Sequence, residues 1–333
     1  MIEFFINLFK KKQPHFPGVL FNESKIDELP KLSEIVATAS PVTWKEIDVT
    51  KLPVYPMYSQ DGSSTCVACT ISLIATILYK QRENKSIKFA PVYVYNQRAN
   101  WSAGMNIPDV FNIAGMGMIP YNFMPSDNLN ENQVSLLTIE PHFKEIADGL
   151  SLDDFFISIP NGDVNLVAST LQATGKPLMV WFNFAYEEWK SIPTIKSLDP
   201  DLIHSVILLP NGFGTIKGKK YFIIQDSWGL SSTSYKGLRL ISEDFFKARN
   251  VFTGYPRRFK FEIGGDKPKY DGSIISLQKC LKYEGFFPLN VDFIENYGPI
   301  TTEGVKSFQR KFGIVDSGKL DLLTVNKIKE FFI

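Results

Sequence analysis

This sequence of 333 residues has little net charge, few cysteines and no long apolar run. Lys and Arg number 36 against 35 Asp and Glu, spread along the chain, so we expect no nucleic-acid partner. Three cysteines without paired spacing argue against a disulfide framework. No stretch approaches the roughly 20 apolar residues that span a bilayer, so no transmembrane segment is expected. A hydrophobic content of 44% still allows a sizeable core in two or three domains.

The first 39 residues differ in composition from the rest. Residues 1–12 place apolar side chains before basic ones, the reverse of a secretory signal, so export by that route is not expected and the location stays unassigned. This segment is either a short helix that docks on its own protein or an anchor at a membrane surface. Residues 13–39 carry several prolines and are typical of an arm, which either inhibits a catalytic cleft or braces the fold.

A polar loop that leads into a long apolar run organises the rest of the chain. Residues 70–79 are largely apolar and lack Gly and Pro, which predicts a helix with Cys66 at its start. The unpaired N–H groups and the positive end of the helix dipole there favour the nucleophilic thiolate. Gln60 precedes this cysteine in the loop, and its amide could complete an oxyanion hole with the Cys66 N–H.

The two halves of the chain have different hydrophobic periods. Pro91 marks a helix start, a second short helix is expected at residues 107–115, and the first half is mainly helical. The second half carries strand-length apolar runs at residues 177–183, 203–209, 220–225 and 237–241. They predict an antiparallel sheet or small barrel, and a cleft between the two halves is the expected place for a site.

A thiol nucleophile needs an imidazole in reach and a third group that orients the ring. Of the three histidines, His15 lies in the arm and His142 in a polar helical stretch, so His204 at the start of a strand is the candidate base. The next strand ends at Asp226, and cross-strand pairing would bring its carboxylate to His204. Trp228 could cover the pair. A core histidine satisfied by a chance acid is, from this segment alone, an equal alternative.

The order of Gln60, Cys66, Leu202-Ile-His204-Ser-Val and Asp226-Ser-Trp-Gly229 resembles the papain-like cysteine peptidases over roughly residues 40–260. The resemblance implies an α+β fold of two lobes, one helical and one of antiparallel strands. It also implies Gln60 as oxyanion donor, Cys66 as nucleophile and His204 as general base and acid. In the same way it implies that the Trp228 indole shields the contact between His204 and Asp226.

Three features depart from the family pattern, one of them the segment Leu230-Ser-Ser-Thr-Ser in place of the tryptophan-glycine pair that the family has shortly after Ser-Trp-Gly. The family usually has asparagine where this chain has Asp226, and cysteine where it has Ser63, so the familiar nearby disulfide is missing. A negative Asp226 should favour the imidazolium form of His204 more than a neutral amide would.

The spacing Cys66-Val-Ala-Cys69 is also that of dithiol redox proteins. A dithiol redox function would leave Gln60 and His204 without a chemical role. Zinc would need more ligands than the three cysteines offer. We therefore expect no cofactor and no metal, and we expect Cys69 to be a small buried side chain one turn along the helix.

The chain is expected to comprise the arm (1–39), a peptidase domain (40–263), a linker (264–270) and a small all-α domain of three helices (271–333). In the last of these, a helix follows residue 274, a second starts with Thr301 in the capping position, and a third follows residue 317. The motif Tyr297-Gly-Pro, with its apolar spacing, is similar to the peptidoglycan-binding domain of the three-helix type. Asp292-Phe replaces the Asp-Gly of that family, and a plain assembly module is the alternative.

Three functions follow from these patterns. The first is a thiol endopeptidase that acts on polypeptide through Cys66, His204 and Asp226, tethered to bacterial cell-wall glycan by residues 271–333. The second is a lysin that hydrolyses the stem peptides of peptidoglycan. The third belongs to another class, a structural or binding protein of a bacteriophage particle with an auxiliary peptidase domain, carried on the virion or released by lysis.

Overall fold

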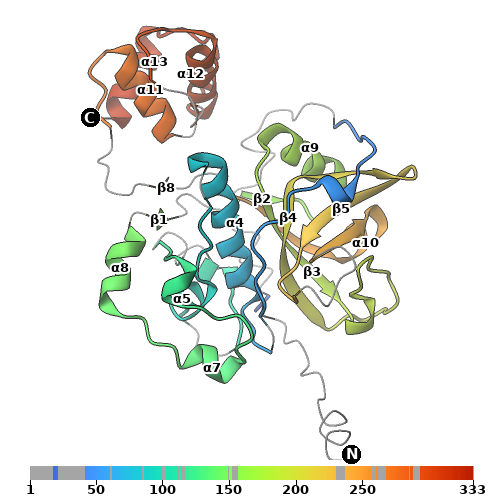
Figure 1. Cartoon of the computed structure of the whole chain (residues 1–333). Coiled ribbons are helices and arrows are strands. Elements are labelled where there is room, and N and C mark those ends of the chain that lie inside the picture. The colour runs from blue at the N-terminus through green and yellow to red at the C-terminus, as the bar shows by residue number, and fades with distance from the viewer. Residues whose placement is uncertain are drawn as a thin grey trace, which may run out of the picture. The chain divides into compact units, whose positions relative to one another are not determined.

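The computed structural model describes fifteen stretches of the chain and divides it into two compact units, residues 1–78 with 87–259 and residues 79–86 with 260–333 (Figure 1). The expected N-terminal helix or anchor, most of the arm and most of the linker lie outside the described residues, as does part of the helix expected at 107–115. The described residues are 18–21, 42–60, 62–84, 86–99, 103–107, 109–110, 113, 117–148, 150–151, 157–229, 237–256, 260–261, 268–284, 286–287 and 293–332.

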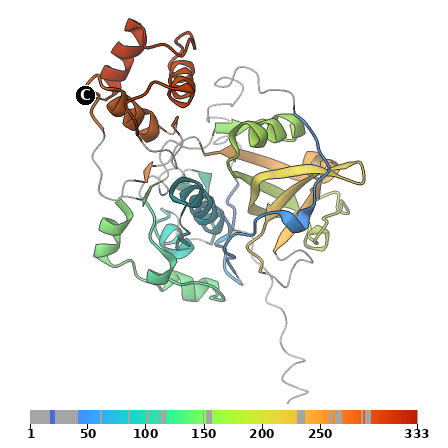
Figure 2. The ribbon, with the colours of Figure 1, turned by 45° about the horizontal axis from the view of Figure 1, so that its top comes forward.

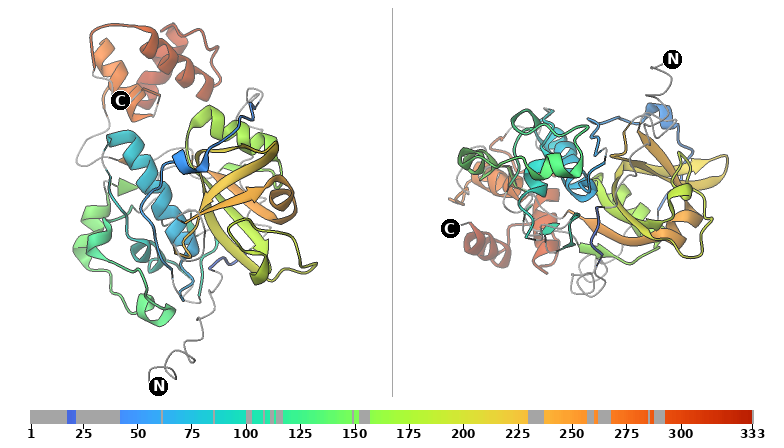
Figure 3. Two further views of the ribbon diagram at one scale, coloured as in Figure 1. Left: turned by 45° about the vertical axis from the view of Figure 1, so that its right-hand side comes forward. Right: turned by 90° about the horizontal axis from the view of Figure 1, so that it is seen from below.

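The central helix of the first unit is α4 (Cys66–Glu83). Its residues are buried from Cys66 to Tyr79, which explains why the sequence is apolar on all sides of the helix. Within this unit α4 lies between the sheet and a group of short helices (Figure 1, Figure 3). These are α5 (Pro91–Tyr95), α7 (Glu131–Ser135) and α8 (Pro141–Asp148), with the 3-10 turn η2 (Tyr121–Phe123). The 3-10 turn η1 (Val49–Lys51) lies instead beside the sheet, just after Glu46, which forms a bridge with Thr215 of the sheet (Figure 1).

The second half of this unit is built on an antiparallel sheet of six strands, in the order β2-β7-β3-β4-β5-β6. The predicted apolar runs become β3 (Leu178–Phe184), β4 (Leu202–Ile216), β5 (Lys219–Gln225) and β6 (Leu238–Ser242). β2 (Ile157–Ile159) and β7 (Asn250–Tyr255) extend the sheet beyond them. The predicted combination of a helical part and an antiparallel part is confirmed.

Two helices of this unit pack against the sheet, α9 (Val164–Thr174) and α10 (Glu243–Arg249). Leu171 of α9 and Phe246 of α10 belong to the same buried apolar cluster as the strands, and α9 lies along the sheet (Figure 2). The other short elements of this unit are η3 (Tyr186–Glu188) and β1 (Leu150–Ser151), while β8 (Lys260–Phe261) belongs to the second unit.

In its described residues from 268 on, the second unit has three helices with a core of their own, α11 (Ile274–Tyr283), α12 (Pro299–Lys311) and α13 (Leu322–Phe331). The expectation that Thr301 caps α12 is wrong, because Gly298 is the N-cap residue. Thr301 lies in the first turn, buried, where its hydroxyl accepts a hydrogen bond from Gln278 Nε2 at 3.0 Å. Within the described residues, no helix is both long and apolar enough to cross a membrane.

Candidate active site

The loop before α4 is held closed by hydrogen bonds of Gln60. Its Nε2 donates to the Ser63 carbonyl at 3.0 Å, and its carbonyl accepts from Ser63 N at 2.7 Å. Ser227 Oγ donates to Gln60 Oε1 at 2.7 Å. The Ser63 hydroxyl donates to the Gln60 carbonyl. These hydrogen bonds hold the loop that leads to Cys66, the fully buried first residue of α4.

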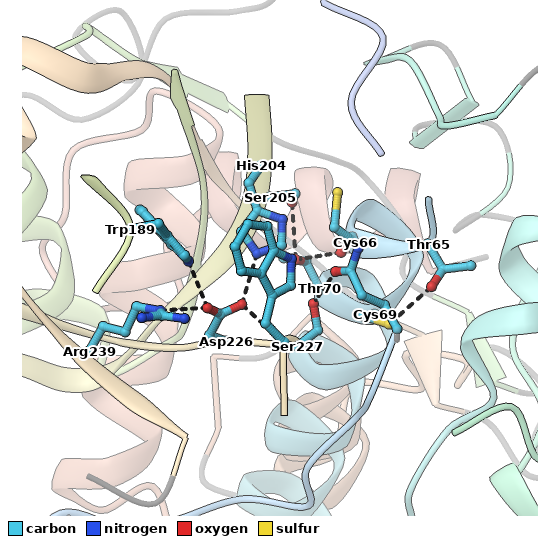
Figure 4. A network of polar contacts seen from close by, with 12 residues as sticks. Thr65, Cys66, Cys69, Thr70, Trp189, His204, Ser205, Asp226, Ser227 and Arg239 are labelled. Carbon is cyan, nitrogen blue, oxygen red and sulfur yellow. Dashed lines mark hydrogen bonds and ion pairs between the residues drawn. The ribbon is translucent and has the colours of Figure 1, made fainter. Parts of the chain in front are cut away.

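Strand register brings His204 and Asp226 together. β4 and β5 pair with Ile207 opposite Gln225, so Asp226, one residue after β5, lies diagonally across from His204 on the same face of the sheet. His204 Nε2 is 2.8 Å from Asp226 Oδ1, and both side chains are fully buried. Trp228 covers the ring, with centroids 4.9 Å apart. Figure 4 shows His204 and Asp226 beside Cys66 on α4.

The charge of the histidine depends on its neighbours. Burial alone would lower the pKa of His204, but the Asp226 carboxylate and its hydrogen bond outweigh this and raise the pKa to about 9, and the adjacent Cys66 adds to the rise. These contacts favour the imidazolium form of the ring. Its other nitrogen, Nδ1, has no hydrogen-bond partner among the described residues, so it is available to a group at Cys66.

Asp226 accepts hydrogen bonds on both oxygens. Oδ1, which faces His204, also accepts a hydrogen bond from the backbone N–H of Trp228 at 3.2 Å. On Oδ2 the indole Nε1 of Trp189 donates at 2.8 Å and the Nε of Arg239 donates at 2.6 Å (Figure 4). Burial opposes ionisation of Asp226, but Arg239 and His204 hold its pKa well below the ordinary value. The carboxylate is therefore ionised and fixed on four sides.

Sequence reasoning missed Trp189 and Arg239. A signal for Arg239 was present, because it is a lone cation in the otherwise apolar run 237–241. β6 pairs Arg239 with Ile224, which puts its side chain on the face that carries Asp226, two residues beyond Ile224. Trp189 lies just after the short turn η3. No hydrophobic period in this segment indicates which way its side chain points.

A segment of the N-terminal arm lies against Cys66. Val19 forms a parallel bridge with Met105, in which Leu20 N donates to the Met105 carbonyl at 2.9 Å and Met105 N donates to the Gly18 carbonyl at 2.8 Å. A Cβ on Gly18 would lie 2.0 Å from the Ser64 carbonyl oxygen and 2.8 Å from Cys66 Sγ. Only glycine fits there, so backbone covers the sulfur.

The other candidates lie elsewhere. His142 is exposed on α8, and His15 lies outside the described residues. Cys69 is buried, and Thr65 Oγ1 is 3.7 Å from its sulfur. Burial raises the pKa of the Cys69 thiol, so this residue stays protonated. In the described part of the chain no group of three or more His, Cys, Asp or Glu side chains could hold a metal ion.

Comparison with known proteins bears on the C-terminal domain and on the fold. Residues 271–328 match a family model described as "Putative peptidoglycan binding domain". No curated protein sequence matches the chain.

Solved structures are similar in fold at low identity. Xylellain, a cysteine protease from Xylella fastidiosa, aligns with a TM-score of 0.58 and 16% identity over 76% of this chain and 98% of its own. Digestive procathepsin L 3 of Tenebrio molitor aligns with a TM-score of 0.52 and 14% identity over 69% of this chain and 76% of its own. Procathepsin B from Trypanosoma congolense aligns with a TM-score of 0.50 and 14% identity over 74% of this chain and 87% of its own. The chain therefore has the papain-like cysteine protease fold, together with a C-terminal domain of the peptidoglycan-binding type.

Proposed function

We propose that the chain is a papain-like thiol endopeptidase that uses Cys66, His204 and Asp226. The observation that carries this proposal is the buried contact of 2.8 Å between His204 and Asp226, beside a cysteine at the start of a buried helix. A histidine held charged next to that cysteine supports an ion pair of thiolate and imidazolium, which is the attacking form of such sites.

In the proposed reaction, the sulfur of Cys66 attacks the carbonyl carbon of a peptide bond. The negative oxygen that forms accepts hydrogen bonds from the Cys66 N–H and from Gln60. His204 then gives its proton to the leaving amine, and a thioester remains on the sulfur. Finally His204 takes a proton from water, which attacks the thioester and releases the acid.

For the C-terminal domain we propose attachment to the peptidoglycan of a bacterial wall. Its family match supports this partner, and its surface has a hollow of about 330 Å³ lined by Phe286, Pro299, Ile300, Glu303 and Ser307. An aromatic ring, apolar walls and a carboxylate suit a glycan with an attached peptide. The tether would concentrate the peptidase at the wall.

For the arm we propose the inhibitory role. The segment 18–21 hydrogen-bonds along Met105 and puts backbone against Cys66, where the carbonyl of a substrate would have to approach. A brace on the outside of the fold would not need a glycine at this contact.

Two other functions are distinguished by one experiment. The purified chain and its Cys66→Ala variant are incubated with casein, with purified peptidoglycan and with a thiol-directed epoxide, and Cys69→Ala serves as the control because Cys69 lies on the same helix in a buried, protonated state. We expect casein cleavage and labelling of Cys66, both lost only in Cys66→Ala.

The remaining outcomes each contradict part of the proposal. Release of wall peptides without casein cleavage would favour the lysin, since the wall-binding domain supports that substrate as well. Absence of labelling at Cys66 under all conditions would favour a structural phage component with an inactive peptidase domain. Full activity of Cys66→Ala would rule out the thiol mechanism.

A further inference from the structure

The carboxylate of Asp226 brings to the site a full negative charge that a neutral amide would not. Asp226, His204 and Arg239 all have fully buried side chains. A buried charge without compensation is costly, and water cannot screen it here. The local charge balance therefore depends on which buried groups face the carboxylate.

Among the described residues, the charged or titratable groups that contact or act on the pair of His204 and Asp226 come from two elements. Arg239, on β6, donates from Nε to Asp226 Oδ2 at 2.6 Å, and Cys66, on α4, acts on His204. With the thiolate, the imidazolium, the carboxylate and the guanidinium all charged, the net charge of these four groups is zero. This is the same sum that a thiolate, an imidazolium and a neutral amide would give.

The geometry of the carboxylate separates its two oxygens. Arg239 and Trp189 hold Oδ2, at 2.6 and 2.8 Å, while Oδ1 faces His204 Nε2. The guanidinium carbon also lies 5.1 Å from the centroid of the Trp189 ring, which favours a cation over that face. Fixing Oδ2 fixes the direction of Oδ1 and with it the plane of the imidazole.

We propose that Arg239 is a positioning residue that offsets the buried charge of Asp226, so that Cys66 reacts over the pH range expected beside a neutral amide. The proposal rests on the proposed thiol peptidase function. Arg239 has no contact with substrate in this scheme and acts through Asp226.

The balance predicts a direction for each variant. Arg239→Gln leaves the charge of the carboxylate uncompensated, so the local electrostatic potential becomes more negative. The acidic and alkaline limbs of the curve of Cys66 reactivity against pH should then both move up by about one to two pH units. Asp226→Asn leaves the guanidinium uncompensated, and both limbs move down. In the double variant Asp226→Asn with Arg239→Gln, both limbs return to within about half a unit of the original. Arg239→Lys keeps the charge and should keep the limbs.

The test measures the rate of Cys66 alkylation by iodoacetamide from pH 4 to 10 in the full chain, with peptide mass analysis to identify the labelled cysteine. This readout does not require cleavage of any substrate. Opening of the arm scales the rate by a common factor, so it does not change the position of the limbs. Thermal melts of the same variants report folding, where each single change should lower Tm by on the order of 10 °C.

Arg239→Gln with a lower Tm but unmoved limbs would show a purely structural residue and overturn the proposal. A double variant whose limbs stay displaced would overturn the charge balance. If Arg239→Gln does not fold, the Lys variant and the double variant still decide the question. Should the limbs move as expected while no peptide is cleaved by any form, the inference stands and the proposed endopeptidase function fails.

Discussion

Adding a single methyl group at Gly18 should expose the thiol of Cys66. The Cβ of Gly18→Ala would lie 2.0 Å from the Ser64 carbonyl oxygen and 2.8 Å from Cys66 Sγ. The nearer atom belongs to the backbone of the loop before α4, where Ser64 N also donates to Glu131 Oε2 at 2.7 Å. Because the loop is held on this side, the arm must be the part that moves.

The cost of that movement sets the size of the effect. Displacing the arm breaks the two hydrogen bonds to Met105 and exposes Val19, which is 9% exposed when docked. Two hydrogen bonds at about 1 kcal/mol each and a valine at about 1.5 to 3 kcal/mol give a gross loss of about 3.5 to 5 kcal/mol. Even a third of this loss corresponds to about a tenfold change in the population of the open form.

The assay is the rate of Cys66 labelling by a thiol-directed epoxide at neutral pH, followed by intact mass. We expect Gly18→Ala to react at least about ten times faster than the unmodified chain. Gly298→Ala is the matched control, since its Cβ would meet Asn296 Nδ2 at an ordinary 3.7 Å in the other unit. Equal rates for Gly18→Ala and the unmodified chain, both as fast as a free thiol, would refute inhibition by the arm.

Two further predictions concern the loop and the sheet. Gln60→Ala should lower kcat by about 10² to 10³ with little change in KM, the range found for an oxyanion donor, and equal kcat for the variant would remove Gln60 from that role. Burial opposes ionisation of Glu188, but Arg249 and three backbone N–H groups lower its pKa from 4.5 to about 2, so its contribution to stability is present above pH 4.5 and is lost as the pH falls toward 2. Glu188→Gln should therefore have a lower Tm than the unmodified chain at pH 7 and the same Tm near pH 2, and a constant difference across this range would contradict the assignment.

The backbone frame of the site could be predicted from sequence because its signals are local. A polar loop followed by a gapless apolar run indicates the start of α4 at Cys66. One strand-length run carries His204 near its start and the next ends just before Asp226, which indicates neighbouring strands. The α9 helix also had readable ends, Asp163 as N-cap and Gly175 at a positive φ of 60°, although the apolar runs alone did not predict it.

The parts that could not be predicted depend on distant geometry. Trp189 reaches Asp226 from an irregular segment, and Val19 reaches Met105 across 86 positions of chain. Neither contact is indicated by hydrophobic periodicity in the sequence. Thr301 shows the opposite failure, in which a local capping preference lost to tertiary structure, because its hydroxyl is taken by Gln278.

Two buried ion pairs determine the geometry around the candidate base, and they are linked through one segment. Arg249 Nη2 binds Glu188 Oε1 at 2.7 Å, and Glu188 also accepts from the backbone N–H of Ser197 at 2.8 Å. Glu188 thereby fixes the turn that carries Trp189, its neighbour in sequence and the donor to Asp226. Buried pairs of this kind add little net stability compared with apolar residues, but losing one partner is costly. Their effect here is therefore on direction: Glu188 orients Trp189, and Trp189 with Arg239 orients the carboxylate that faces His204.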